Sequence, residues 1–275
     1  KILTMAAALD SGLVTPQSAM EDQDVIEVGG QPIRNWDRKG HGLVSMVDVL
    51  ALSLNVSAAQ LSTQMGSRTF YGYLNNFGLG KRTGVDLSGE IAGRLKQPGD
   101  TDWSESELGM NSFGQGVAVT PLQLITAVAA VANDGRLMRP YVVEAWEQEG
   151  KLERTEPAVV RQLISVETAH QLTQMLVQAV ERGAPSALVP GYRMAGKTGT
   201  AQIPIPGGYH LEDTIVSFVG YLPAEDPEAI ILVKIDRPQS SRWGSDVAAP
   251  IFSRIAQRAC HLLDIPPQDA LLAGR

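Results

Sequence analysis

The chain has 275 residues, of which 44% are hydrophobic and 19% are charged, and its formal net charge is −7. This composition predicts a globular protein with a sizeable core and excludes an intrinsically disordered one. The acidic excess argues against a general nucleic-acid binder, and no apolar run approaches the roughly 18 residues that a membrane-spanning helix needs.

The first half of the chain is predicted to be mainly helical, with irregular connections. Ser45 is expected to cap a helix, with Asp48 completing a variant of the capping box. Loop-rich or irregular segments, marked by glycine, are expected over 13–44 and 80–111. Helices are expected over 1–9, 45–52, 56–65 and 68–77.

The second half changes from helices to strands. Thr120 and Pro121 open an apolar helix, since proline is favoured at the first helical position, and Ser165 caps an amphipathic helix. The late strands are joined by short connections, which predicts an antiparallel sheet and an α+β domain. Helices are expected over 121–131, 166–182 and 246–263, strands over 141–143, 193–202, 215–221 and 229–235, and a hairpin turn over 147–151.

The histidines and the single cysteine form no recognisable site. None of the four histidines has a partner at metal-binding spacing, and the apolar neighbours of Cys260 indicate a core residue. No nucleophile elbow, Walker loop or dinucleotide-binding loop occurs. The sequence therefore contains no motif for a metal site or a dinucleotide cofactor, and a Ser-His-Asp triad stays open but has no nucleophile elbow to support it.

The most informative segment is Lys197-Thr198-Gly199-Thr200, in a predicted strand. Gly199 lets a ligand backbone lie close to the strand edge, while Lys197 supplies a positive charge. Thr198 and Thr200 offer hydroxyls on one face, because strand side chains alternate. The backbone N–H of Thr200 can stabilise an oxyanion, and the strand edge can bind an extended peptide. A chance Lys-Thr-Gly at a strand end is the competing interpretation.

Two further features lie upstream. Ser53-Leu54-Asn55 lies between two predicted helices and can direct a hydroxyl and an amide into a cleft, although Asn55 could simply cap the second helix. A serine three residues before a lysine on a helix lies one turn from it and can be deprotonated by a neutral lysine. None of the seven lysines has such a serine within the chain, and only Lys1 could have one outside it.

The order Ser-x-x-Lys, Ser-x-Asn, Lys-Thr-Gly is typical of penicillin-binding proteins and class A β-lactamases. The surrounding segments resemble class B, monofunctional penicillin-binding proteins, most of all the division-specific type, and the resemblance extends to about residue 262. The segments that carry it are Lys1–Leu9, Gly84–Glu90, Ser112–Leu124, Pro190–Gln202 and Ser217–Tyr221.

The resemblance implies the penicillin-binding transpeptidase or serine β-lactamase-like fold, α+β, with an antiparallel sheet flanked by helices and an all-helical lobe. It implies a transpeptidase domain over 1–264, truncated at its N-terminus with the nucleophilic serine outside the chain, and a C-terminal tail over 265–275. It also implies a location in the periplasm or on the outer face of the cytoplasmic membrane, with an N-terminal anchor absent from this chain.

The implied activity is that of a peptidoglycan D,D-transpeptidase, which cross-links stem peptides through a serine acyl-enzyme and is inhibited covalently by β-lactams. By resemblance, Lys1 is the general base, Ser53 relays protons, Asn55 holds the substrate amide and Lys1, and Lys197 attracts the terminal carboxylate. Thr198, Gly199 and Thr200 would bind substrate or β-lactam, with Thr200 N–H in the oxyanion hole.

The implied partners are stem peptides ending in D-Ala-D-Ala, β-lactam antibiotics, a membrane glycosyltransferase and division-complex proteins, with no nucleic acid and no cofactor. Two other classes share the motifs. One is a β-lactamase or β-lactam-sensing receptor of the same fold, and the other is a catalytically silent binding module. A D,D-carboxypeptidase would differ from the transpeptidase only in using water as the acyl acceptor.

Overall fold

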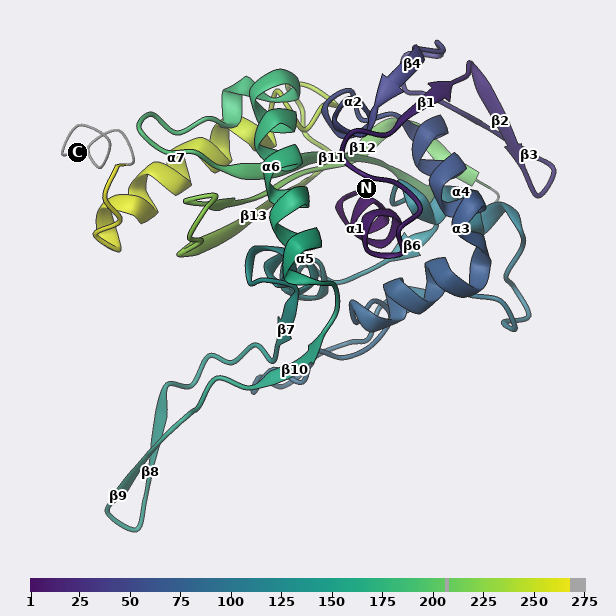
Figure 1. Cartoon of the computed structure of the whole chain (residues 1–275). Helices are drawn as coiled ribbons and strands as arrows, with labels where there is room; N and C mark the ends of the chain where they lie inside the picture. Colours follow the sequence, from purple (N-terminus) through teal and green to yellow (C-terminus); the bar gives the residue numbers. More distant parts are fainter. Residues whose placement is uncertain (206–207, 268–275) are drawn as a thin grey trace.

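The computed structural model describes residues 1–205 and 208–267, and its centre is a three-stranded sheet (Figure 1). The sheet contains β11 (Ala195–Ile205), β12 (Gly208–Leu222) and β13 (Ala229–Asp236), hydrogen-bonded in that order and antiparallel throughout. The predicted α+β fold with an antiparallel sheet is therefore confirmed, although β11 and β12 are longer than the sequence indicates.

Local side-chain caps determine where several helices begin. Ser45 and Asp48 form the predicted capping box, and Thr120 forms another with Gln123. Ser165 accepts the N–H of Thr168 at the start of the amphipathic helix, as expected. The helices in the described residues are α1 (Ile2–Asp10), α2 (Met46–Ala51), α3 (Asn55–Asn76), α4 (Ser106–Ser112), α5 (Pro121–Ala132), α6 (Val166–Gly183) and α7 (Ala248–Leu262).

Alternating side chains of β12 divide the core between the two faces of the sheet. Because neighbouring strand residues point in opposite directions, Phe218 packs against α7, where its ring lies 4.6 Å from that of Phe252. Val219 and Tyr221 belong to the other cluster, which includes residues of α1, α5 and α6. The sheet therefore lies between α7 on one face and these helices on the other.

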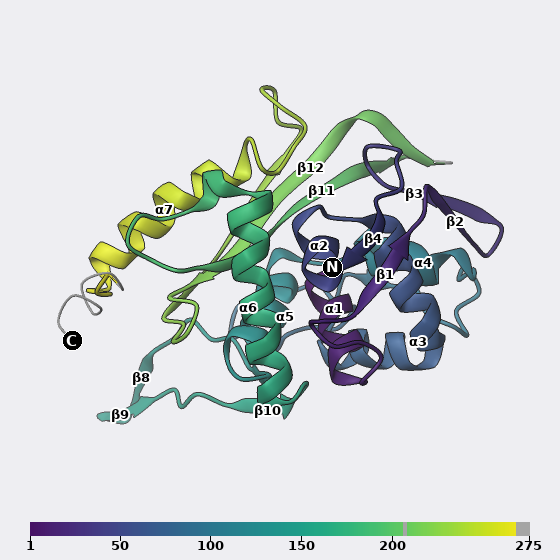
Figure 2. The same cartoon turned by 45° about the horizontal axis from the view of Figure 1, so that its top comes forward.

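Helix α1 lies in the interior of the molecule. Every residue from Ile2 to Leu9 is buried, as expected for a helix that is apolar on all sides. Figure 2 shows its start near the centre of the molecule, and α1 packs against α3, α5 and α6. Gly66 breaks α3 with φ 75° and ψ 158°, so the predicted helix end at this glycine is confirmed.

Two segments expected to be irregular contain regular structure. Their strands have only two to four residues, too few to show an alternating pattern, and β1 finds its partner about twenty residues further on. All of α4 except its last residue also lies in the segment 80–111, whose glycine, serine and aspartate residues indicated irregular structure. The short pairs are β1 (Ala19–Asp22) with β4 (Gly42–Ser45), β2 (Val25–Val28) with β3 (Gln31–Arg34), and β5 (Arg94–Leu95) with β6 (Val117–Ala118).

The strand predicted over 141–143 is wrong. The N–H groups of Val142 and Val143 donate to the carboxylate of Asp86, at 2.9 and 2.8 Å, and not to a neighbouring strand. A side chain more than fifty residues away thus satisfies backbone groups that an apolar, β-branched pattern assigns to a sheet. The strand in this region lies earlier, at β7 (Arg136–Met138), paired with β10 (Val159–Gln162).

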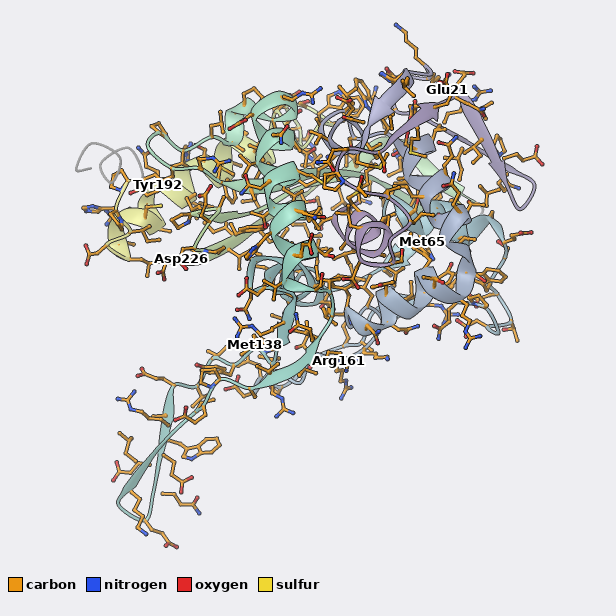
Figure 3. The ribbon with its side chains drawn as sticks, viewed as in Figure 1. Glu21, Met65, Met138, Arg161, Tyr192 and Asp226 are labelled. Carbon is orange, nitrogen blue, oxygen red and sulfur yellow. The ribbon has the colours of Figure 1, made fainter. Side chains whose placement is uncertain are left out.

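A two-stranded hairpin of β8 (Ala145–Gln148) and β9 (Lys151–Arg154) projects away from the rest of the molecule (Figure 1). Its turn confirms the hairpin predicted over 147–151. Figure 3 labels Met138 and Arg161 at the base of this arm, on β7 and β10. The arm lies apart from the helices that surround α1.

Among the described residues, no helix is long and apolar enough to cross a membrane. Within 1–205 and 208–267, no cluster of three or more histidine, cysteine, aspartate or glutamate side chains is arranged to hold a metal ion. Cys260 is buried, as predicted, in a cluster that also contains Ile265. Most of the expected C-terminal tail, residues 268–275, lies outside the described residues.

Candidate active site

Lys1 and Asn55 meet where the start of α1 approaches the start of α3. The ammonium of Lys1 donates a hydrogen bond to Oδ1 of Asn55 at 2.7 Å and lies 5.5 Å from the centre of the Phe113 ring. Burial, together with the positive charge of Lys197, lowers the pKa of Lys1 well below its ordinary value. This environment favours a neutral amine.

Lys197 lies on β11 and is 8% exposed. Its ammonium donates to the hydroxyl of Thr198 at 3.0 Å and to the carbonyl of the same residue at 3.2 Å. Burial lowers the pKa of Lys197 to about 8. The charge of Lys197 also lowers the pKa of Lys1, so the two side chains lie close enough to interact, although 196 positions separate them in the chain.

The turn that carries Ser53 has a strained backbone. Ser53 has φ 58°, a left-handed conformation that costs a residue other than glycine roughly 1 kcal/mol. Among the described residues, the Ser53 hydroxyl has no hydrogen-bond partner, so it is available to a ligand. α2 ends at Ala51 and α3 begins at Asn55, and this arrangement leaves Ser53 on the short connection between the two helices.

A buried polar network holds this turn. Oδ1 of Asn35 accepts the N–H groups of Asn55 and Val56, at 2.8 and 3.1 Å. Nδ2 of Asn35 donates to Asp22 at 2.6 Å, and the other carboxylate oxygen of Asp22 accepts the hydroxyl of Ser57 at 2.5 Å. Asn35 therefore caps α3, and the alternative in which Asn55 caps its own helix is wrong. The side chain of Asn55 remains available to Lys1.

The roles of Asn35 and Asp22 could not be predicted from the sequence. Each is almost fully buried, 2% and 1% exposed, in a segment expected to be a loop. Buried polar side chains are normally hydrogen-bonded, but the pattern of residues along the chain does not identify the partner.

Strand β11 forms one edge of the described sheet, and its neighbour β12 explains Gly199. In the pairing of β11 with β12, Gly199 lies opposite Ser217, and a Cβ atom at Gly199 would collide with the Ser217 hydroxyl. The glycine is thus required by the sheet itself as well as by the close approach expected of a ligand. Two residues apart on the strand, Thr198 is partly exposed and Thr200 is exposed, and the Thr200 hydroxyl accepts the N–H of Gly244 at 3.2 Å.

Of the predicted site residues, the structure joins Lys1 and Asn55 by a hydrogen bond. Lys197 lies close enough for its charge to lower the pKa of Lys1. Thr198 joins them through its contact with Lys197. An arrangement of paired lysines beside a Ser-x-Asn turn and an exposed strand edge is that of an acyl-transferring serine enzyme.

Comparison with known families assigns the chain within that class. The family described as the penicillin binding protein transpeptidase domain matches residues 1–257, and the chain belongs to this family. The resemblance to class B penicillin-binding proteins is confirmed by the relatives below.

Stage V sporulation protein D of Bacillus subtilis is 36% identical over 277 residues, which cover 98% of this chain and 42% of that protein. The peptidoglycan D,D-transpeptidase FtsI homolog of Mesostigma viride is 28% identical, over 97% of this chain and 49% of that one. The structure of penicillin binding protein 3 from Mycobacterium tuberculosis, complexed with aztreonam, superposes with a TM-score of 0.86 at 32% identity and covers 97% of this chain and 62% of that one. The chain thus spans less than half of the length of these two curated relatives.

Proposed function

We propose that this chain is the catalytic domain of a peptidoglycan D,D-transpeptidase that acts through a serine acyl-enzyme. The observation that supports the proposal is the hydrogen bond between Lys1 and Asn55. A partly buried lysine with a strongly lowered pKa can be neutral at physiological pH, and a neutral amine can accept the proton of a hydroxyl. The proposed nucleophile is a serine three positions before Lys1, outside the sequence given.

In the proposed reaction, this serine attacks the carbonyl of the penultimate D-alanine of a stem peptide while Lys1 accepts its proton. The C–N bond to the terminal D-alanine breaks, and the leaving amine takes that proton by way of Ser53. A serine ester remains. An amine of a second stem peptide attacks the ester and gives its proton to Lys1, and the released serine oxygen recovers a proton from the same base.

Substrate binding is assigned to the edge of β11. An extended peptide can add to an exposed strand edge through main-chain hydrogen bonds. We propose that Lys197 attracts the terminal carboxylate, that Thr198 and Thr200 bind it, and that the N–H of Thr200 joins the N–H of the nucleophilic serine in the oxyanion hole. The burial of Lys197 strengthens this attraction because few waters screen its charge.

The proposed setting is extracytoplasmic, as for other enzymes that build the cell wall, with attachment to the membrane through a segment outside this sequence. β-Lactams, which mimic the D-Ala-D-Ala terminus, would acylate the same serine. A membrane glycosyltransferase and proteins of the division complex are the proposed protein partners.

The test is the intact mass of the protein, extended upstream through the expected serine, after treatment with benzylpenicillin. One stable adduct that is lost when this serine is changed to alanine, and greatly slowed by Lys197→Ala, is the expected result. The absence of an adduct would indicate a catalytically silent binding module. An adduct that is hydrolysed within seconds would indicate a β-lactamase. A second stem peptide then separates the remaining options, since a cross-linked product supports a transpeptidase and free hydrolysed peptide a carboxypeptidase.

A further inference from the structure

Two tryptophans from opposite sides of the site are in contact. Trp36 lies in the connection between β3 and β4, and Trp243 lies in the connection between β13 and α7. Their ring centres are 5.3 Å apart with an angle of 68° between the planes, an edge-to-face arrangement. Both rings are partly exposed, 55% and 36%, so the contact is not a consequence of burial in the core.

Trp36 is tied to the Ser53 turn. Its indole N–H donates to the carbonyl of Leu52 at 3.0 Å. This carbonyl belongs to the peptide group that joins Leu52 to Ser53, and the orientation of a planar peptide group sets φ of the residue that follows. The N–H of the same peptide group donates to Leu50, so both of its polar atoms are held. Trp36 thus helps to keep Ser53 in its left-handed conformation.

The residue next to Trp36 holds the other end of the same turn. Asn35 accepts the N–H groups of Asn55 and Val56, as described above. The two neighbouring residues therefore hold the Ser53 turn at both ends. Trp36 donates to the carbonyl of Leu52, just before Ser53, and Asn35 accepts the first N–H groups of α3.

Trp243 is tied to the opposite side of the site. The next residue, Gly244, donates its N–H to the hydroxyl of Thr200. Gly244 also lies against the carbonyls of Gly199 and Ser217, since a Cβ atom on it would come within 2.6 and 2.8 Å of these oxygens. The connection that carries Trp243 is thus packed directly on the Gly199-Thr200 segment.

We propose that Trp36 is a positioning residue for Ser53, and that its contact with Trp243 couples the Ser53 turn to the Lys197–Thr200 strand. The inference rests on the proposed transpeptidase function, because it assigns Trp36 an effect on acylation through Ser53. Neither tryptophan is required to touch the substrate. The contact between the two tryptophans links the segment that holds Ser53 to the segment that is bonded to Thr200. Loss of this contact would let Ser53 and Thr200 move relative to each other.

The test compares acylation kinetics with benzylpenicillin in the protein extended upstream through the expected serine. Trp36→Phe keeps an aromatic ring but removes the N–H, and Trp243→Leu removes the aromatic partner. We expect Trp36→Phe to lower the limiting acylation rate roughly three- to tenfold, the range for loss of one hydrogen bond, without changing the half-saturating concentration. In a Ser53→Ala background, the same substitution should have little further effect.

Trp243→Leu should slow acylation less when Trp36 is already phenylalanine than when it is tryptophan. Trp146→Phe is the matched control, since Trp146 is 57% exposed on the distant arm and its indole also donates a hydrogen bond, to Glu153. This control should acylate at the wild-type rate.

Three results would overturn the inference. Trp36→Phe could leave the limiting rate unchanged, it could slow acylation equally with and without Ser53, or it could accelerate acylation, which would make the tryptophan pair a barrier to entry. An unmodified wild-type protein would contradict the proposed function itself, and this inference with it. A normally acylated wild type with an unaffected Trp36→Phe variant would contradict only the positioning role.

Discussion

Asn55 accepts a hydrogen bond from the ammonium of Lys1 at 2.7 Å, while Asn35, twenty residues earlier, caps the helix in its place. Asparagine is a favoured N-cap residue, but Asn55 is the first residue of α3 and the N-cap position is held by Leu54. Two N–H groups of that terminus, those of Asn55 and Val56, already donate to Asn35. The Lys1–Asn55 contact thus depends on a side chain that touches neither the lysine nor the strand that carries Lys197.

Removal of the acceptor from this pair should impair acylation. Asn55→Ala leaves Lys1 without its fixed partner, so its orientation toward the serine is lost. We expect the limiting rate of acylation by benzylpenicillin to fall by about 10² or more, the usual contribution of a positioned base. Asn75→Ala is the control, because Asn75 lies on the same helix and makes a similar amide contact, with Gln97, away from the site. Equal rates in the two variants would refute the assignment.

The lowered pKa of Lys197 predicts how its contribution to stability depends on pH. The pKa is about 8 in the folded protein and 10.5 without the surrounding structure. Below about pH 8 the lysine is charged in both states and burial of its charge is unfavourable, whereas above pH 10.5 it is neutral in both. Between these values the unfolded chain binds more protons, so the stability contributed by this group rises with pH.

Denaturant unfolding of wild type and Lys197→Met should reveal this effect. Lys197→Met should be stabilised relative to wild type near pH 7.5, and that advantage should shrink by about 3 kcal/mol as the pH rises to 10.5. A difference that stays constant with pH would show that Lys197 has an ordinary pKa in the folded protein.

The same substitution should shift the pH at which acylation begins. The charge of Lys197 is one cause of the lowered pKa of Lys1, after burial. Without that charge, the pKa of Lys1 should rise, and a higher pH is needed to make Lys1 neutral. We expect the acid side of the pH profile of the limiting acylation rate to move to higher pH in Lys197→Met. A shift to lower pH, or none, would mean that Lys1 does not act as the base.

The network beneath the Ser53 turn should be important for stability. Asp22→Ala removes the carboxylate that accepts hydrogen bonds from Asn35 and Ser57, and leaves those buried groups unsatisfied. We expect the free energy of unfolding to fall by about 2–4 kcal/mol. Asp24→Ala, which removes an exposed ion pair with Arg34, should change it by less than about 1 kcal/mol. Similar losses in both variants would show that the network contributes little.

Much of the helical structure could be predicted because its signals are local. Ser45, Thr120 and Ser165 cap helices through contacts with residues three positions later, and Gly66 interrupts α3 where it stands. The strands before α2 were not predicted, because four residues are too few to show the alternation of polar and apolar side chains that identifies a strand. The failed strand over 141–143 shows the same limit, since Asp86 satisfies its backbone from a distant loop.

The sequence by itself determined the residues of the candidate site: Lys1, Ser53, Asn55 and the Lys197–Thr200 strand stand in an order and spacing that few protein families share. It also determined the antiparallel sheet, through three late strands joined by short connections. The tertiary structure decided how these groups meet. The packing of α1 against α3 brings Lys1 to Asn55, and Asn35 caps α3 in place of Asn55. Burial lowers the pKa of both lysines, and the charge of Lys197 lowers that of Lys1 further. Contacts of this kind join residues separated by many positions, and burial depends on every element packed around a group. Neither can therefore be predicted from a local pattern of residues.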